Sequence, residues 1–139
     1  RINDGMGKEV VSEILKLMIG RGLPIKGGRV LVLGLSFKEN CPDLRNTRVV
    51  DLIRELREFG LDVDVHDPWV SAEDARNECG LELMKALPEQ DGYHAVVLAV
   101  AHDQYKTLGV DAVRAFTTPG GVIYDIKGLF GKDAVDGRL

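Results

Sequence analysis

The sequence lacks the features that mark secreted, membrane-spanning or nucleic-acid-binding proteins. It has two cysteines, Cys41 and Cys79, whose number and spacing fit neither a disulfide framework nor a metal site, so we expect a reducing, cytoplasmic compartment. Its longest unbroken apolar run, Ala95–Ala101, is far too short to cross a bilayer, and the first residues do not resemble a secretory signal. The net charge of −4 predicts no general attraction for nucleic acid or membranes, so any phosphate must be bound by a local cluster of donors.

The length and composition are those of one globular domain. The 139 residues suffice to bury a sizeable core, and 45% of them are apolar, with few aromatic residues. The chain begins at Arg1 without an initiator methionine and enters a helical pattern almost at once. We therefore expect a piece of a larger protein.

Helical and strand-like apolar patterns alternate along the chain. The run Arg29–Gly34 is continuous in valine and leucine, which is typical of a strand buried on both faces of a parallel sheet. The spacing predicts further strands at 61–66, 95–100 and 121–125, a short edge strand at 81–83, and helices at 4–19, 49–59, 71–79 and within 103–116. Candidate helix caps are Asn3 or Asp4, Asn46 or Thr47, and Ser71. Strands separated by helices pair in parallel, which predicts a doubly wound, mostly parallel α/β sheet with helices on both faces.

The first helix predicts a contact surface. Its apolar residues recur at helical spacing, and Val10, Ile14 and Met18 form one face. That face would be exposed unless it packs against the sheet or against a second copy of the chain. We expect a homo-oligomer, a dimer or larger, in the intact protein.

The loop after the first strand is the candidate site, because ligands bind at the carboxyl ends of the strands in such sheets. The segment from Gly34 to Asn46 is long for a connection between a strand and a helix. It is not a G-x-G-x-x-G loop, since Ser36 and Glu39 stand where the second and third glycines would be. A dinucleotide lying tightly across the helix start is therefore disfavoured.

The same loop carries side chains suited to a nucleotide. Lys38 can act as a point charge, Arg45 as a bidentate fork for phosphate, and Phe37 as a flat apolar surface for a base or ribose. A solvated loop, in which Lys38 pairs with Glu39 or Asp43, explains the same residues without any ligand. Composition and spacing alone leave both interpretations open.

The order of residues in this loop resembles a known family. Gly34-Leu-Ser-Phe-Lys38 followed by Asp43-x-Arg45-x-Thr47 is similar to the G-x-x-F-K and D-x-R-x-S/T signature of the C-terminal domain of the UDP-glucose/GDP-mannose dehydrogenase family. The resemblance extends over the chain, through Ile2-Asn3-Asp4, Val65-His66-Asp67-Pro68, Ala101-His102 and Tyr124-Asp125-Ile126-Lys127. The segment Glu39–Thr47 is most similar to bacterial members that oxidise UDP-N-acetylhexosamines for capsule or O-antigen (Vi-type) polysaccharides.

The resemblance implies a role for four residues of this chain. Phe37 and Lys38 would contact the nucleotide part of a sugar nucleotide, and Lys127 would lie near the substrate, at a position where the family often has arginine. The exchange of arginine for lysine removes a bidentate fork and weakens that assignment. Arg45 would contact the pyrophosphate of NAD from across a cleft.

The resemblance also implies how the chain belongs to a longer enzyme. Residues 1–22 would be the end of the helical middle, dimerisation domain, and residues 23–139 the UDP-sugar-binding, Rossmann-like domain that closes over an N-terminal NAD-binding domain. The family oxidises the sugar C6 hydroxyl to a carboxylate with two NAD, through a thiohemiacetal and a thioester on a cysteine. That cysteine would lie in the middle domain, because Cys41 and Cys79 do not match its position. By itself, the chain would turn over nothing.

Two pairs of adjacent residues, His66-Asp67 and His102-Asp103, resemble catalytic pairs, but a structural role is favoured for both. His102 and Asp103 are adjacent, so they are not expected to face each other, and Asp103 is better placed as a helix cap. Asp67 lies farther past Gly34 than the roughly 20 residues expected of a ribose-binding acid, so it is expected to fix the turn that follows it. Trp69 would cover either the sheet edge or a subunit contact.

Two other classes of function are alternatives to a dehydrogenase domain. A non-catalytic nucleotide-binding or regulatory module of the same fold fits the glycine-poor loop and the missing nucleophile equally well. A flavodoxin-like signalling domain is disfavoured, because it needs an acidic phospho-acceptor at the end of the first strand, where Leu33–Ser36 offers none. The acidic residues show no metal-ligand spacing, so no metal site is expected.

Overall fold

The computed structural model describes the backbone of residues 2–139 and the side chains from residue 7 onward. Five strands form one sheet in the order β2-β1-β3-β4-β5, and all of its pairings are parallel. The strands are β1 (Arg29–Leu33), β2 (Asp62–His66), β3 (Tyr93–Leu98), β4 (Thr117–Asp125) and β5 (Gly137–Arg138). The order reverses between β1 and β3, so the predicted doubly wound sheet is confirmed.

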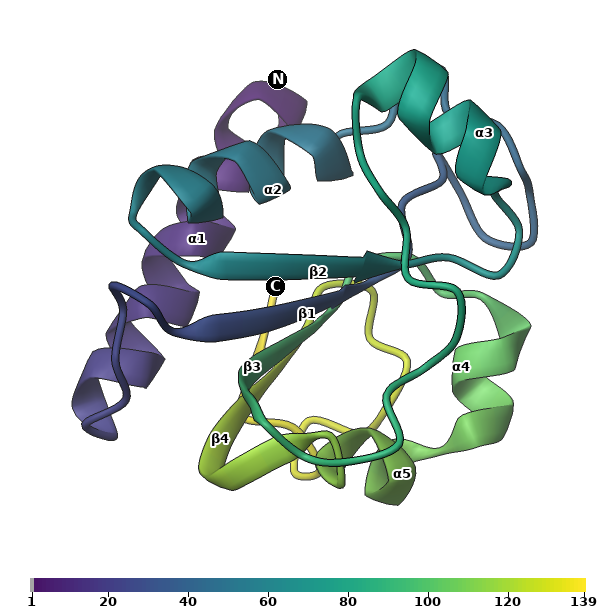
Figure 1. Ribbon diagram of the computed structural model, residues 1–139. Coiled ribbons are helices and arrows are strands. Elements are labelled where there is room, and N and C mark those ends of the chain that lie inside the picture. The colour runs from purple at the N-terminus through teal and green to yellow at the C-terminus, as the bar shows by residue number, and fades with distance from the viewer. Residues whose placement is uncertain (1) are drawn as a thin grey trace.

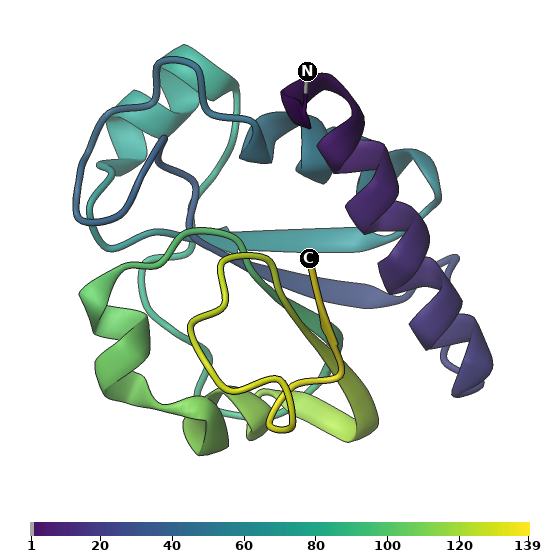
Figure 2. The same cartoon turned by 180° about the vertical axis from the view of Figure 1, so that it is seen from behind.

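Helices cover both faces of this sheet (Figure 1, Figure 2). One face carries α1 (Ile2–Gly20) and α2 (Val49–Glu58), and the other carries α4 (Asp103–Leu108) and α5 (Val110–Arg114). A short helix after β2, α3 (Ala72–Asp74), continues into one π-helical turn, η1 (Ala75–Cys79). No helix in the described part of the chain is long and apolar enough to cross a membrane.

The alternation of side chains along β1 explains the two layers. Val30 and Val32 pack in one apolar cluster with α1 and α2, whereas Leu31 and Leu33 pack in a second cluster with α4 and α5. All four are completely buried. An uninterrupted apolar strand in the sequence therefore corresponds to a strand covered on both faces.

The first helix, α1, packs against the sheet and shares its core. Val10, Ile14 and Met18 have no exposed surface, and Glu13 accepts a hydrogen bond from the Tyr124 hydroxyl of β4. Burial of these three apolar side chains contributes roughly 5 to 9 kcal/mol. The face that was expected to need either the sheet or a second copy is thus covered by the sheet of its own chain.

Several element bounds differ from the sequence-based ones. α1 begins at Ile2, so Asn3 and Asp4 lie inside the helix, and the prediction that one of them caps it is wrong. The expected strand at 81–83 is reduced to a single bridge between Val65 and Leu83, because the segment turns away after one pairing. Ser71 caps α3 as predicted, with its side chain accepting from the Asp74 N–H.

The last third of the sheet shows the largest differences. β4 begins at Thr117, whereas the sequence predicted a strand only over residues 121–125. The glycine-rich segment forms an irregularity inside the strand instead, where the pairing with β3 shifts register between Tyr93 and Ala95. β5 was not predicted, because two residues carry no periodic pattern and their pairing with Tyr124 and Asp125 is a tertiary contact.

One carboxylate ties the C-terminal segment to both helical layers. Asp136 accepts hydrogen bonds from Arg21, which follows α1, from Arg114, which ends α5, and from the Ile123 N–H, each at 2.7 Å. Burial alone would raise the pKa of Asp136. The Ile123 N–H and the two guanidinium groups outweigh that effect and hold the pKa below its usual value.

Replacing Asp136 with asparagine is expected to lower the free energy of unfolding by about 1 to 3 kcal/mol near neutral pH, because a charge-assisted acceptor is lost. The carboxylate stabilises the fold above its unfolded-state pKa of about 3.9, and this contribution is lost as the pH falls through the lower folded-state pKa. Urea titrations at decreasing pH would measure it, with the exposed Asp133→Asn as control. A stability difference that stays constant down to about pH 2 would contradict this role.

Candidate functional site

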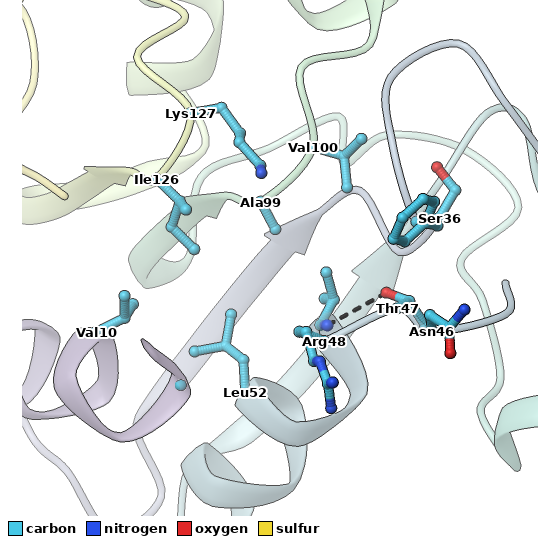
Figure 3. Close-up of a pocket in the computed structure, with 13 residues that line it drawn as sticks. Val10, Ser36, Asn46, Thr47, Arg48, Leu52, Ala99, Val100, Ile126 and Lys127 are labelled. Atoms are coloured by element: carbon cyan, nitrogen blue, oxygen red, sulfur yellow. Dashed lines mark hydrogen bonds between the residues drawn. The ribbon is translucent and has the colours of Figure 1, made fainter. Parts of the chain in front are cut away.

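A pocket lies at the carboxyl edge of the sheet, where the strand order reverses. The connections after β1 and β3 run to opposite faces there, which opens a crevice in sheets of this kind. The pocket has a volume of about 150 Å³, and its apolar walls include Val10 of α1, Leu52 of α2, Val100 after β3 and Ile126 after β4 (Figure 3). Ligand pockets usually measure about 300 to 1,000 Å³, so this one fits only part of a nucleotide.

The polar rim of the pocket is cationic. Of the thirteen described residues that line it, Arg48 and Lys127 are charged and none is acidic. Arg48 stands at the start of α2, where the first backbone N–H groups add partial positive charge, and it lies 3.9 Å from Asp51 of the same helix. The pocket therefore favours an anionic group such as a phosphate.

A buried carboxylate shapes the turn that carries Lys127. Asp125 ends β4 with no exposed surface, and its two oxygens accept hydrogen bonds from the Leu129 and Phe130 N–H groups at 3.0 and 2.9 Å. These bonds close the turn over residues 126–130, from which the Lys127 side chain points toward the pocket (Figure 3). The Tyr-Asp-Ile-Lys motif thus contains both the cation, Lys127, and the carboxylate, Asp125, that fixes the turn carrying it.

The loop after β1 brings Phe37 to the pocket and leaves Lys38 outside it. Phe37 lines the pocket with 49% of its surface exposed, and its N–H donates to the Asp43 carbonyl at 2.8 Å. Lys38 is exposed and is not among the lining residues. Within the described residues it forms no ion pair with Glu39 or Asp43. The Asp43 carboxylate pairs with Arg45 instead.

Thr47 fixes the other end of this loop. Its hydroxyl donates to the Leu35 carbonyl at 2.6 Å and accepts from the Val49 N–H at 3.2 Å. Arg48 occupies the backbone cap position of α2, so the capping side chain comes from one residue earlier. Of the two predicted caps, Asn46 and Thr47, it is Thr47 that makes the bond.

Arg45 lies on the solvent side of the loop, paired with Asp43. Its Nε and Nη2 atoms donate to the two carboxylate oxygens, both at 3.0 Å, and its backbone N–H adds a third bond at 2.8 Å. The hydrogen bonds from Arg45 hold the pKa of Asp43 below its usual value. The Arg45 side chain is 82% exposed and does not line the pocket. Asp43 occupies one edge of the guanidinium and leaves the other for an external anion.

The loop after β1 does not fit the pyrophosphate of NAD. In a dinucleotide-binding fingerprint, backbone N–H groups after the first strand bind that pyrophosphate. Here the Leu35 and Ser36 N–H groups donate to Asp67 Oδ2 at 2.7 and 2.9 Å, and the Asp67 side chain is fully buried. A carboxylate of the protein therefore occupies the place of an anionic ligand. Among the predicted residues, Arg45 keeps a free guanidinium edge outside the pocket, which can bind a phosphate group.

One residue of each predicted histidine–aspartate pair, Asp67 and His102, meets the other across the sheet edge. Asp67 fixes the turn after β2 as expected, since its Oδ1 accepts from the Trp69 N–H at 2.8 Å, and it also contacts the buried His102. The prediction that Asp103 caps α4 is wrong, because Asp103 is the first helical residue and its N–H is satisfied by the Asn40 side chain. Asp103 is exposed, so it does not face His102.

The structure brings together some of the predicted site residues and adds others. Phe37 and Lys127 line one pocket, whereas Lys38 and Arg45 lie outside it. Sequence reasoning missed Arg48, although a cation directly after the helix-capping Thr47 at the ligand edge of a sheet is a usable signal.

Comparison with known proteins shows the family. The family model of the "UDP-glucose/GDP-mannose dehydrogenase family, UDP binding domain" matches residues 31–132. The chain is 50% identical over its whole length to UDP-N-acetyl-D-glucosamine 6-dehydrogenase of Pseudomonas aeruginosa and 41% identical to the protein of the same name from Salmonella typhi. It covers 33% and 32% of those proteins, so it spans about a third of the length of the curated relatives it matches.

Solved structures show the same architecture. NDP-N-acetyl-D-galactosaminuronic acid dehydrogenase from Methanosarcina mazei superposes with a TM-score of 0.83 at 27% identity, over 96% of this chain and 27% of that one. The match includes the parallel sheet and the layers of helices on it, so the Rossmann-like fold is confirmed. From its sequence and its fold, the chain belongs to the UDP-glucose/GDP-mannose dehydrogenase family and contains that family's UDP binding domain.

Proposed function

We propose that the chain binds the UDP-sugar substrate of an NAD-dependent nucleotide-sugar 6-dehydrogenase. Such an enzyme oxidises the C6 hydroxyl of a UDP-N-acetylhexosamine or UDP-hexose to a carboxylate for polysaccharide synthesis. The observation that carries the proposal is the cationic pocket at the reversal of strand order, which the signature residue Phe37 and Lys127 both line. The names of the two curated relatives favour UDP-N-acetyl-D-glucosamine as the first substrate to test.

The proposal gives each of the four predicted residues a distinct role. Phe37, half exposed at the pocket mouth, packs against the base or ribose of the nucleotide. Lys127 and the positively polarised start of α2 face the diphosphate. Lys38 adds charge on the outer side of the same loop. Arg45 contacts the pyrophosphate of NAD, which is bound mainly by an N-terminal domain of the longer protein.

The groups that carry out the oxidation lie outside this chain in the proposal. NAD accepts the hydride, and a middle domain supplies the nucleophilic cysteine. Cys41 and Cys79 are partly buried free thiols. Burial, with a contribution from the neighbouring Glu78, raises the pKa of the Cys79 thiol, which opposes formation of the reactive thiolate.

We further propose that residues 1–22 are the end of the middle domain and that residues 23–139 form the UDP-sugar domain. Because α1 packs on the sheet through its Val10 face, it would connect the two domains rigidly. The pocket fits only part of a nucleotide, which supports further walls from other domains or from a second subunit of a homo-oligomer. Free thiols support a cytoplasmic enzyme.

Reduction of NAD by the full-length protein that contains this chain would test the proposed function. UDP-N-acetyl-D-glucosamine, UDP-N-acetyl-D-galactosamine, UDP-glucose and GDP-mannose would be compared in parallel. We expect oxidation of at least one UDP-sugar, with two NAD reduced per sugar nucleotide. Tight binding of UDP-sugars without any NAD reduction would instead support a non-catalytic or regulatory nucleotide-binding module, and activity with none of the four would exclude the proposed function.

A further inference from the structure

We propose that His102 is a positioning residue for substrate binding, which holds both ends of the three-residue arc Phe37–Glu39. The buried imidazole thereby sets where Phe37 and Lys38 meet the sugar nucleotide. The identity of the ligand as a sugar nucleotide rests on the proposed function, whereas the hydrogen bonds of His102 do not depend on it. His102 follows β3 and lies outside the loop that it holds.

The imidazole of His102 connects the two residues that flank the arc. On one side, its Nε2 lies 3.0 Å from Asp67 Oδ2, which accepts from the Ser36 N–H, and 3.2 Å from Ser36 Oγ. On the other side, its Nδ1 accepts from the Asn40 N–H at 2.9 Å. One rigid ring therefore fixes the distance between Ser36 and Asn40, and the arc runs between them.

The hydrogen bonds define a neutral imidazole with both nitrogen atoms in use. The Asn40 N–H can only donate, so Nδ1 bears no proton. Burial would raise the pKa of Asp67, but His102 and three backbone N–H groups outweigh it and hold the pKa below its usual value. Asp67 is therefore an ionised acceptor, and Nε2 donates the proton to it. Removing Nε2 takes one donor from the buried Asp67 carboxylate, and removing Nδ1 leaves the partly buried Asn40 N–H without its acceptor.

A reciprocal bond strengthens the contact between the loop and the segment after β3. Asn40 takes a left-handed φ of 56° and its Oδ1 accepts from the Asp103 N–H at 3.0 Å. Trp69, whose ring centroid lies 6.4 Å from that of His102, covers the same edge and donates to Gln104 at 3.1 Å. With His102 fully buried beneath these residues, water does not compete for its bonds.

Two substitutions separate the two bonds of the ring. In His102→Gln the carboxamide nitrogen reaches the place of Nε2 and keeps the bond to Asp67, but the acceptor for Asn40 is lost. In His102→Asn the carboxamide oxygen takes the place of Nδ1 and keeps the bond to Asn40, but the contact with Asp67 is lost. The matched control is Tyr105→Phe, which removes an equally buried hydroxyl that bonds to His66 and forms no hydrogen bond with Ser36, Asn40 or the arc between them.

Kinetics of the full-length protein provide the first readout. We expect each His102 variant to raise the KM for the UDP-sugar about tenfold and to change kcat by less than about twofold, the signature of weakened binding with intact chemistry. Tyr105→Phe should lower the melting temperature comparably and leave the KM unchanged. A KM in His102→Gln that matches wild type, or an equal rise in Tyr105→Phe, would overturn the proposal.

Amide hydrogen exchange of the same ligand-free protein provides a readout that needs no activity. Exchange in peptides covering residues 35–42 should become faster in His102→Gln and His102→Asn and remain as in wild type in Tyr105→Phe. If wild type oxidises no sugar nucleotide, the proposed function fails, and exchange still decides whether His102 holds the arc. Unchanged exchange in both His102 variants would show that it does not.

Discussion

Alanine at position 34 is expected to destabilise the domain by about 3 to 5 kcal/mol, a large part of the stability of a typical domain. Gly34 has a φ of +106°, which side-chain-bearing residues rarely adopt. A Cβ there would lie 2.6 Å from Val100 Cβ and 2.8 Å from the Val100 backbone nitrogen. The backbone atom cannot move aside without disturbing the segment after β3. Backbone strain and overpacking therefore act together.

Urea unfolding followed by circular dichroism would measure this effect, and Gly20 offers a matched control. Gly20 lies in the last turn of α1, where an added Cβ would meet nothing within 4 Å, so Gly20→Ala should leave stability unchanged or raise it by up to about 1 kcal/mol. Equal stabilities for Gly34→Ala and wild type would contradict this prediction. They would mean that the segment around Val100 can move to make room for the added Cβ despite its close packing.

The second large effect is expected from a reciprocal pair of variants in the full-length protein. Lys127→Ala should raise the KM for the UDP-sugar about tenfold to a hundredfold, because it removes the proposed contact with the diphosphate, and a charged hydrogen bond of this kind contributes about 1.5 to 3 kcal/mol. Arg45→Ala should raise the KM for NAD by a similar factor, because it removes the proposed contact between the free guanidinium edge, which lies outside the pocket, and the NAD pyrophosphate. Each variant should leave the other Michaelis constant nearly unchanged.

Initial-rate kinetics with each substrate varied at saturating levels of the other would separate the two effects. Lys132→Ala, at an exposed position in the same C-terminal segment as Lys127, controls for a general loss of positive charge. A rise in both Michaelis constants by both variants would mean that the two residues act on one ligand. Values equal to wild type throughout would remove Lys127 and Arg45 from the site.

The sequence predicted the sheet well where local pattern and tertiary packing agree. β1 and β3 are apolar runs because both faces of these strands are covered, and such runs can be recognised from the local sequence alone. The register irregularity in β4 near Gly121 and the two-residue β5 were not predictable, because both depend on which strand lies alongside.

The candidate site was predictable in its residues and only partly in its geometry. The motifs that contain Phe37 and Lys127 pointed to the carboxyl edge of the sheet, and both residues line the pocket there. The separation of Lys38 and Arg45 from that pocket follows from the fold of a long loop, which no periodic pattern specifies. The partnership of Asp67 with His102 was invisible in the sequence, since the two residues are far apart along the chain and meet only across the sheet edge.

The internal carboxylate at the end of β2 has a thermodynamic consequence. A loop that closes only around an incoming phosphate loses conformational freedom at each binding event, and that loss is subtracted from affinity. The loop after β1 closes on Asp67 instead, before any ligand arrives. Binding should therefore show little of the unfavourable entropy of loop ordering in calorimetry, and product release should leave the loop in place for the next substrate molecule.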